Sequence, residues 1–331
     1  PAGKDPGFFK REGREGVLIM GKPKIYIDGK EGTTGLQIYD RLEKRADLDL
    51  LLIDEEKRKD PEERKKYLNG ADLVFLCLPD AAAREAVSMV ENPGVRIIDA
   101  STAHRTAPGW VYGFPELSGK QREAVKQAKR VANPGCHATG FIAAVYPLTA
   151  MGILEEGAAL TCFSLTGYSG GGKKMIAEYQ DPARDVRLDS PRIYGLNLKH
   201  KHLPEMKAVC GLKTDPIFCP VVSDYYKGMA TTTALFSCQT GGLGAEQVRE
   251  KLAAWYEGQK LVTVAPFGAG GPMLAGNEMA GKDSLVLYVN GREDQIIITA
   301  LFDNLGKGAS GAAVQNMNLM LGFEETAGLE W

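Results

Sequence analysis

The amino-acid sequence predicts an α/β fold in two parts, and three observations support this prediction. Up to about residue 135, short apolar strands alternate with helical patterns, which is typical of a parallel sheet covered by helices. Glycines crowd the turn after the first strand, between Gly29 and Gly35. From residue 136 onward strands outnumber helices, which indicates an α+β part built on a largely antiparallel sheet.

The composition is that of an ordinary globular protein. Of the 331 residues, 44% are hydrophobic and 25% are charged, and the net charge is −2. This balance gives no sign of a nucleic-acid partner or an anionic membrane partner, and no apolar run approaches the roughly 20 residues of a membrane span. The six cysteines form no Cys-x-x-Cys pair. We therefore expect reduced cysteines in a cytoplasmic protein, and no metal site.

Residues 1–20 read as a charged, glycine-rich extension ahead of the first clear strand. They lack the apolar core of a signal peptide. We expect them to be loosely held.

The first clear elements read as a βαβ unit. A strand over 24–28 leads into Gly29, Gly32 and Gly35, and then come a helical pattern over 36–42 and a strand over 48–53. Glycines at this turn let a pyrophosphate approach the helix N-terminus. The spacing Gly-x-x-Gly-x-x-Gly departs from the usual fingerprint, so a purely structural turn is the alternative.

The end of the second strand bears on the choice of nucleotide. Asp54 stands at the strand end where an acidic residue would bind the ribose hydroxyls, and this position taken alone indicates NAD. Lys57, Arg58 and Lys59 follow directly and are suited to clamp a 2′-phosphate. A solvated loop is the alternative for these bases, and we favour NADP.

Later strands of the first part end in two candidate binding loops. A strand over 73–78 ends at Pro79, where the nicotinamide half of a dinucleotide usually passes, and Asp80 is predicted to cap a helix through residue 90. A strand over 95–98 leads into a polar cluster that holds Arg105, which is suited to pair with a carboxylate or phosphate.

Cys136 is the strongest candidate for a nucleophile. A strand over 130–132 ends in Asn133-Pro-Gly135, and an apolar helix follows Cys136. Backbone N–H groups and the positive end of the dipole at a helix N-terminus stabilise a thiolate and lower the thiol pKa. The same amides can bind the oxyanion formed when the thiolate attacks a carbonyl. A small buried core residue is the alternative.

The second part reads as a run of strands with few helices. One helix is predicted over 245–256, and an amphipathic helix is predicted in the tail, over 307–321. The predicted strands are 159–165, 217–222, 230–238, 261–267, 284–289 and 295–302.

The segment Gly167–Lys173 almost spells a P-loop. The residue after its lysine should be Ser or Thr to hold Mg²⁺, and here it is Lys174. We therefore reject nucleotide hydrolysis. Successive glycine amides bind anions well, so we expect this loop to bind an acyl phosphate.

Two of the four histidines flank one lysine in His200-Lys-His202. On an extended segment both rings lie on one side, and a histidine beside a thiolate can act as general acid or base. A metal site is the minor alternative because no third ligand is evident nearby. Glu205 is expected either to orient a ring or to cap the next helix. His137 is expected to serve structure or substrate contact.

Taken together, these motifs resemble those of the N-acetyl-γ-glutamyl-phosphate reductase family, in its shorter-chain branch. They follow the family's order over nearly the whole chain from residue 22. The Cys136 motif is shared in outline with aspartate-semialdehyde dehydrogenases, whereas the segments 112–117 and 200–205 favour the glutamyl enzyme. The segments that carry the resemblance are Asp28–Gly35, Ala100–Thr106, Tyr112–Leu117, Asn133–Thr139, Gly167–Lys173, His200–Glu205 and Asp303–Gly311.

The resemblance implies a Rossmann NADP-binding domain of residues 21–135 and 305–331, and a catalytic and oligomerisation domain of residues 136–304. It implies a cytoplasmic homo-oligomer, a tetramer, that acts in arginine biosynthesis. In the implied reaction Cys136 attacks the acyl phosphate, and hydride from NADPH reduces the thioester to the semialdehyde.

The predicted site residues fall into three groups. Catalysis is assigned to Cys136, His202, His200 and Glu205, with His202 preferred slightly over His200. Cofactor binding is assigned to Gly29, Gly32, Thr33, Thr34, Gly35, Lys57, Arg58, Pro79 and Asn304. Substrate binding is assigned to Ser101, His104, Arg105, Asn133, Ser169, Gly170, Gly171 and Lys173.

Three alternatives remain open. An aspartate-semialdehyde dehydrogenase would run the same chemistry on a shorter substrate. A non-catalytic sensor would bind NADP with the Rossmann part alone. A phosphotransferase would use the Gly167–Lys173 loop to bind ATP.

Overall fold

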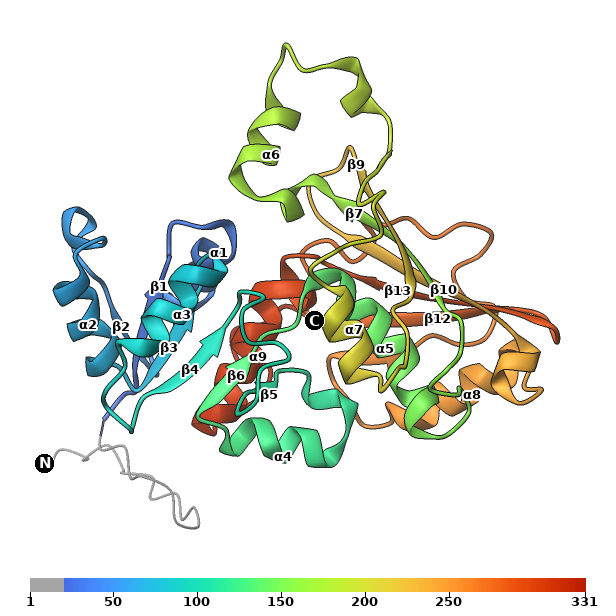
Figure 1. Cartoon of the computed structure of the whole chain (residues 1–331), viewed down its shortest axis with the longest axis horizontal. Coiled ribbons are helices and arrows are strands. Elements are labelled where there is room, and N and C mark those ends of the chain that lie inside the picture. The colour runs from blue at the N-terminus through green and yellow to red at the C-terminus, as the bar shows by residue number, and fades with distance from the viewer. Residues whose placement is uncertain (1–20) are drawn as a thin grey trace, which may run out of the picture.

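The computed structural model describes residues 21–331 and is built on two sheets (Figure 1). A parallel sheet lies at one end of the molecule and a larger mixed sheet at the other, and the C-terminal helix α9 (Gly311–Leu321) lies between them in this view. The predicted α/β fold class is confirmed. The predicted extension, residues 1–20, lies outside the described residues.

The first part is a six-stranded sheet with the strand order β2-β1-β3-β4-β6-β5. Every pairing in it is parallel. This is the doubly wound arrangement, in which ligands bind outside the carboxyl ends of the strands. The strands are β1 Lys24–Asp28, β2 Asp49–Leu51, β3 Leu73–Leu76, β4 Arg96–Asp99, β5 Val111–Tyr112 and β6 Arg130–Ala132.

Helices cover both faces of the parallel sheet. One face packs against α1 (Thr33–Leu42), α4 (Gly119–Gln127) and α9, in a core that includes Ile38 and Val314. The other face packs against α2 (Pro61–Gly70) and α3 (Asp80–Ser88). The end of the chain thus packs on a sheet formed by its beginning.

The turn between β1 and α1 requires glycine at two positions. Gly29 has φ +85°, and a Cβ atom there would lie 2.4 Å from the carbonyl oxygen of Cys77. A Cβ atom at Gly35 would lie 2.4 Å from the carbonyl oxygen of Gly29. Glycine therefore lets the backbone fold back tightly and start a helix at the carboxyl edge of the sheet.

The second part is a seven-stranded sheet with the order β11-β12-β13-β10-β7-β9-β8. The β11–β12 and β7–β9 pairings are parallel and the other pairings are antiparallel, so the predicted largely antiparallel sheet is confirmed. The short edge strand β8 was not predicted. The strands are β7 Thr161–Gly167, β8 Arg192–Ile193, β9 Ile217–Ser223, β10 Met229–Phe236, β11 Val262–Val264, β12 Leu285–Gly291 and β13 Gln295–Phe302.

One face of the mixed sheet is covered by α5 (Cys136–Ala150), α7 (Leu203–Val209) and α8 (Ala245–Trp255). Their apolar side chains, among them Phe141 and Val248, join those of the strands in one core. By contrast, α6 (Gly172–Gln180) belongs to a lobe that projects away from both sheets (Figure 1).

The C-terminal helix differs from the predicted amphipathic helix over 307–321. A π-helical turn, η6 (Gly306–Ser310), comes first, and α9 follows. All residues of α9 from Gly311 to Met320 are buried. The prediction of an amphipathic helix is wrong because α9 packs against the parallel sheet, α1 and α4 at once.

Two local predictions near the sheet need correction. The helix α2 was missed, although Asp60 accepts hydrogen bonds from the Glu62 and Glu63 N–H groups and Pro61 opens the helix, which is a sequence-level start signal. Asp80 does not cap α3, because Pro79 occupies the N-cap position. The Asp80 carboxylate instead accepts hydrogen bonds from the Thr102 N–H and hydroxyl groups.

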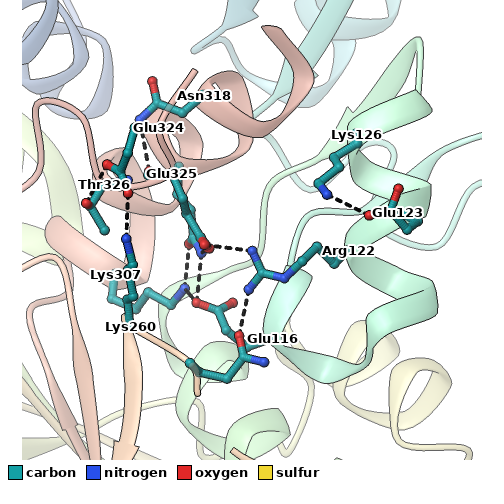
Figure 2. A network of polar contacts seen from close by, with 12 residues as sticks. Glu116, Arg122, Glu123, Lys126, Lys260, Lys307, Asn318, Glu324, Glu325 and Thr326 are labelled. Atoms are coloured by element: carbon teal, nitrogen blue, oxygen red, sulfur yellow. Dashed lines mark hydrogen bonds and ion pairs between the residues drawn. The ribbon is translucent and has the colours of Figure 1, made fainter. Parts of the chain in front are cut away.

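A network of polar side chains ties the chain after α9 to α4 (Figure 2). Arg122 on α4 pairs with Glu325 at 2.7 Å. Gln315 on α9 donates to Glu325 and to Glu116, at 2.7 and 2.8 Å. Polar contacts therefore hold the C-terminal segment in its place beside the parallel sheet.

Candidate active site

A cavity of about 450 Å³ lies at the carboxyl edge of the parallel sheet, where the second part meets it. Turns after β1, β3 and β4 supply Gly32, Cys77 and Ala100 to its wall. This is the edge at which doubly wound sheets bind ligands. The predicted site residues that line the cavity are Gly32, Thr33, Thr34, Arg105, Asn133, Cys136, Ser169, Gly170, Gly171, His200, His202 and Asn304.

Cys136 is the first residue of α5, as the sequence predicts. Gly135 occupies the N-cap position, and none of the described side chains caps the helix. A Cβ atom at Gly135 would lie 2.4 Å from Arg105 Nη1, 2.5 Å from His202 Nε2 and 2.6 Å from Glu205 Oε1. Because Gly135 has no side chain, Arg105, His202 and Glu205 can all pack against the backbone next to Cys136.

The π-helical turn η6 forms another side of the Cys136 environment. A Cβ atom at Gly308 would lie 3.0 Å from Cys136 Cβ, and Gly308 lines the cavity. The Asn133 side chain donates to the carbonyl oxygen of Ala309 at 2.9 Å. A hydrogen bond therefore joins the segment before Cys136 to the turn η6.

The Cys136 thiol does not have the lowered pKa that its position at a helix N-terminus predicts. Burial raises the pKa of this thiol, while Arg105, the His137 backbone N–H and Lys201 act in the opposite direction. The prediction is wrong in direction because loss of water around the sulfur outweighs these favourable charges. A neutral thiol has to give its proton to a base before it attacks.

Two neutral histidines line the same cavity as this thiol. Burial and the charge of Arg105 hold the pKa of His202 well below its usual value, and burial with the charge of Lys201 lowers the pKa of His200 to about 4. His202 is buried, and its Nδ1 has no hydrogen-bond partner among the described residues. His200 is half-buried, and its Nδ1 accepts from the His202 N–H at 3.3 Å.

Glu205 does neither of the things predicted for it. Its Oε1 accepts from Arg105 Nη1 at 2.7 Å, and its Oε2 accepts from the Tyr112 hydroxyl at 2.7 Å and from the Gly135 N–H at 3.1 Å. Among the hydrogen bonds of the described chain, none joins Glu205 to a histidine ring, and His202 holds the N-cap position of α7. The buried Glu205 carboxylate therefore fixes Arg105 and the segment that leads to Cys136.

The N-terminus of α1 is suited to hold dinucleotide phosphates. None of the described side chains caps this helix, and its first turn carries no acidic residue. Thr33 and Thr34 lie on the cavity wall. Such a helix end binds a pyrophosphate through backbone N–H groups and the helix dipole, so the residues present fit a dinucleotide.

The glycine-rich loop forms another part of the cavity wall. Ser169, Gly170 and Gly171 line the cavity, whereas Lys173 is exposed outside it. Asn304 fixes this wall, because its side chain donates to Ser169 Oγ at 2.9 Å and accepts from the Gly228 N–H at 2.8 Å.

Ser101 and His104 lie behind the cavity rather than on its wall. Ser101 Oγ and His104 Nδ1 lie 2.7 and 2.6 Å from Asp99 Oδ2, and the His104 ring stacks on Trp110. These contacts shape the loop that carries Arg105. The other predicted residues that do not line the cavity are Gly29, Gly35, Lys57, Arg58, Pro79, Lys173 and Glu205.

Sequence reasoning missed Tyr194 and Lys201, which both line the cavity. The Tyr194 hydroxyl lies 2.8 Å from His137 Nε2, and His137 Nδ1 lies 2.7 Å from Ser164 Oγ. Lys201 stands between the two predicted histidines, so the sequence held a signal for it. Tyr194 follows a short edge strand and belongs to no motif.

Within residues 21–331, no group of three or more His, Cys, Asp or Glu side chains is arranged to hold a metal ion. No helix in that range has both the length and the apolar character to cross a bilayer.

Comparison with known proteins bears directly on this site. Residues 136–304 match the semialdehyde dehydrogenase dimerisation domain, and residues 52–128 match the semialdehyde dehydrogenase NAD binding domain. The N-acetyl-gamma-glutamyl-phosphate reductase 2 of Nostoc sp. is 47% identical over 323 residues, which cover 94% of this chain and 100% of the relative. The N-acetyl-gamma-glutamyl-phosphate reductase of Brucella ovis is 48% identical over 308 residues, which cover 91% of this chain and 99% of the relative.

Solved structures share the fold. The aspartate semialdehyde dehydrogenase II of Vibrio cholerae, complexed with ASA, matches with a TM-score of 0.70 at 17% identity, over 91% of this chain and 98% of that one. At this identity the likeness shows the fold alone. The relatives, in contrast, match nearly the whole chain at almost one identical residue in two. The chain belongs to the N-acetyl-γ-glutamyl-phosphate reductase family, within the semialdehyde dehydrogenases.

Proposed function

We propose that this protein uses NADPH to reduce N-acetyl-γ-glutamyl phosphate to N-acetylglutamate semialdehyde, a step of arginine biosynthesis. The relatives at 47% and 48% identity bear the name of this reductase. One observation carries the proposal: Cys136 opens α5 on the wall of a cavity shared with the glycine-rich loop and the N-terminus of α1. A nucleophile, anion-binding amides and a dinucleotide site thus meet in one place.

The proposed domain division follows the two sheets. Residues 21–135 and 305–331 are assigned to NADP binding, and residues 136–304 to catalysis and oligomerisation. The packing of α9 on the parallel sheet supports this division, as does the family match that spans 136–304.

In this proposal NADP is held at the carboxyl edge of the parallel sheet and supplies the hydride. The turn from Gly29 to Gly35, with Thr33 and Thr34, would hold the pyrophosphate. Pro79 and Asn304 would contact the nicotinamide half, and Lys57 and Arg58 would hold the 2′-phosphate.

The chain's own residues prepare the acyl group. Cys136 gives its thiol proton to neutral His202, and the sulfur attacks the γ-carbonyl carbon. A C–S bond forms and the C–O bond to phosphate breaks. Arg105 and the Ser169–Gly171 loop bind the leaving phosphate, which takes the proton from His202. The resulting thioester on Cys136 accepts hydride far more readily than a carboxylate does.

The reduced adduct on Cys136 then collapses. Amides at the start of α5 hold the oxyanion of the hemithiacetal until the C–S bond breaks and the semialdehyde leaves. The thiolate regains a proton from solvent through His202. The geometry favours His202 over His200 for this role because its Nε2 packs against Gly135 and its Nδ1 is buried without a partner in the described chain.

A homo-oligomer is supported by the open face of the mixed sheet. Phe163, Ile217, Phe236 and Ile297 point to the same face and are each 45–57% exposed. A second copy of the chain would cover this face. We expect a tetramer in the cytoplasm, and light scattering on the purified protein measures its mass.

The test is reduction of NADP⁺ by N-acetylglutamate semialdehyde in the presence of phosphate or arsenate. Wild-type turnover that disappears in Cys136→Ser supports both the substrate and the nucleophile. If the wild type is silent with this aldehyde but turns over aspartate semialdehyde, the substrate assignment is wrong. Silence with both aldehydes, despite measured NADP binding, contradicts the enzymatic proposal.

A further inference from the structure

The charges on the cavity wall are unbalanced. Among the described residues that line the cavity, only Arg105 and Lys201 carry a full charge, and no carboxylate lines it. Burial lowers the pKa of His137 to about 3, and His200 and His202 are held neutral in the same way. The cavity is therefore built for an anion.

The charge of Arg105 is already matched. Its Nη1 donates to the buried Glu205 carboxylate at 2.7 Å, and its Nε donates to the carbonyl oxygen of Asn133 at 3.0 Å. The Arg105–Glu205 pair has no net charge, so it offers directional donors rather than an unbalanced cation.

Lys201 is the cation of the cavity wall whose charge is not balanced by a carboxylate of the described chain. Its side chain is exposed on the loop before α7 and makes no ion pair with a described carboxylate. Its field reaches Asp80, but that carboxylate is bound by Thr102. Its field also reaches Cys136 and all three histidines of the wall. Lys201 therefore shares one cavity with the reacting sulfur, and an anion paired with its ammonium group would lie in that cavity.

The substrate of the proposed function has an anion at each end. Its acyl phosphate has to lie where phosphate leaves, beside Cys136, Arg105 and the glycine-rich loop. Its α-carboxylate lies at the far end of the carbon chain and needs a separate cation. We propose that Lys201 is the specificity-determining residue that pairs with this α-carboxylate, and this rests on the proposed function.

This pairing also explains why Lys201 stands between two histidines. The substrate's carboxylate would hold the loop that carries His202 while the acyl group lies against Cys136.

The test uses the full chain and two aldehydes, N-acetylglutamate semialdehyde and its α-carboxamide. Lys201→Met removes the charge and keeps the stem, Lys201→Arg keeps the charge, and Lys199→Met is the matched control from the same loop. A charge-assisted hydrogen bond predicts that Lys201→Met raises KM for the carboxylate aldehyde by about 10- to 100-fold, with kcat little changed. Lys201→Arg should restore most of this loss, and Lys199→Met should behave as wild type.

The carboxamide aldehyde tests the proposed ion pair by itself, because it keeps the carbon chain of the substrate and lacks the carboxylate charge. Wild type should prefer the carboxylate aldehyde by a similar factor, and Lys201→Met should lose this preference. If Lys201→Met weakens both aldehydes equally, the proposal is overturned. A rise in KM for inorganic phosphate instead of the aldehyde would place Lys201 at the phosphate and would overturn it as well.

A binding readout separates this proposal from the proposed function. N-acetylnorvaline carries the α-carboxylate without a second anion, and its amide lacks the charge. Calorimetry should show that wild type prefers the acid and that Lys201→Met does not, whether or not any aldehyde is turned over. Equal binding of acid and amide by wild type contradicts the pairing.

Discussion

The ammonium group of Lys307 lies 2.6 Å from Glu116 Oε1, and both side chains are almost completely buried (Figure 2). Lys307 also donates to Gln315 Oε1 at 2.6 Å. The pair joins the segment 112–117 to the π-helical turn η6, whose Gly308 packs on Cys136. Two motifs that are far apart in the sequence thus support one wall of the cavity.

Lys307→Met should lower the free energy of unfolding by about 3–5 kcal/mol, because the Glu116 carboxylate would stay buried without its cation. The double variant Glu116→Gln, Lys307→Met removes both charges and should recover most of this loss. Denaturant unfolding measures both. Arg122→Met is the matched control: its pair with Glu325 is more exposed, so a smaller loss is expected. A double variant as unstable as the single one would contradict the argument.

Gly135→Ala should abolish most activity while the chain still folds. The added methyl group would lie 2.4–2.6 Å from Arg105, His202 and Glu205, so at least one of these groups has to move away from Cys136. Displacement of an acid–base group predicts a fall in kcat of about 10²-fold or more. Gly119→Ala is the matched control, because an added Cβ atom there has no atom within 4 Å, and it should keep the wild-type kcat. Gly152→Ala is unsuitable because Gly152 has φ +69°, which strains any other residue. Steady-state kinetics with the semialdehyde decides between these outcomes.

The sequence predicts local features of this fold well, and it fails where distant residues decide the outcome. Strand and helix periodicity, with the turn before Cys136, placed both sheets and the start of α5. The partners of Glu205 lie 100 and 93 positions away at Arg105 and Tyr112, and no local pattern reveals them. The burial that raises the Cys136 pKa comes from packing of both parts of the chain around it. The burial of α9 is also decided by distant residues: its sequence predicts an amphipathic helix, but the parallel sheet, α1 and α4 all pack against it.

Alkylation of Cys136 should speed up as pH rises past the ordinary thiol range near about 8.5. Burial raises the pKa of this thiol, so the reactive thiolate is scarce at neutral pH and becomes abundant only in more alkaline solution. The rate of iodoacetamide labelling against pH measures this. Cys136→Ser reports the background, which includes the exposed Cys238. A labelling rate that levels off below pH 7 would show that the helix N-terminus outweighs burial.

His202→Asn should lower kcat by about 10²- to 10⁴-fold, the usual contribution of a general acid or base. His200→Asn should lower it by about tenfold or less, because His200 contributes a single 3.3 Å hydrogen bond from the His202 N–H. Single-turnover rates of thioester formation separate the two variants most cleanly. The reverse ranking would assign the proton to His200.

Arg58→Ala and Lys57→Ala should each raise KM for NADP by about tenfold and leave KM for NAD unchanged, since a charge-assisted bond to the 2′-phosphate would be lost. Asp54 accepts from the Glu56 N–H and so caps the turn that presents both bases. Within residues 21–331, the one ion pair of Arg58 is a loose 3.8 Å contact with the exposed Glu55, which leaves the guanidinium available to a ligand. Lys120→Ala, on the exposed start of α4, is the matched control and should change neither constant. Equal losses with NADP and NAD would mean that the two bases support the turn after β2 and do not recognise the 2′-phosphate.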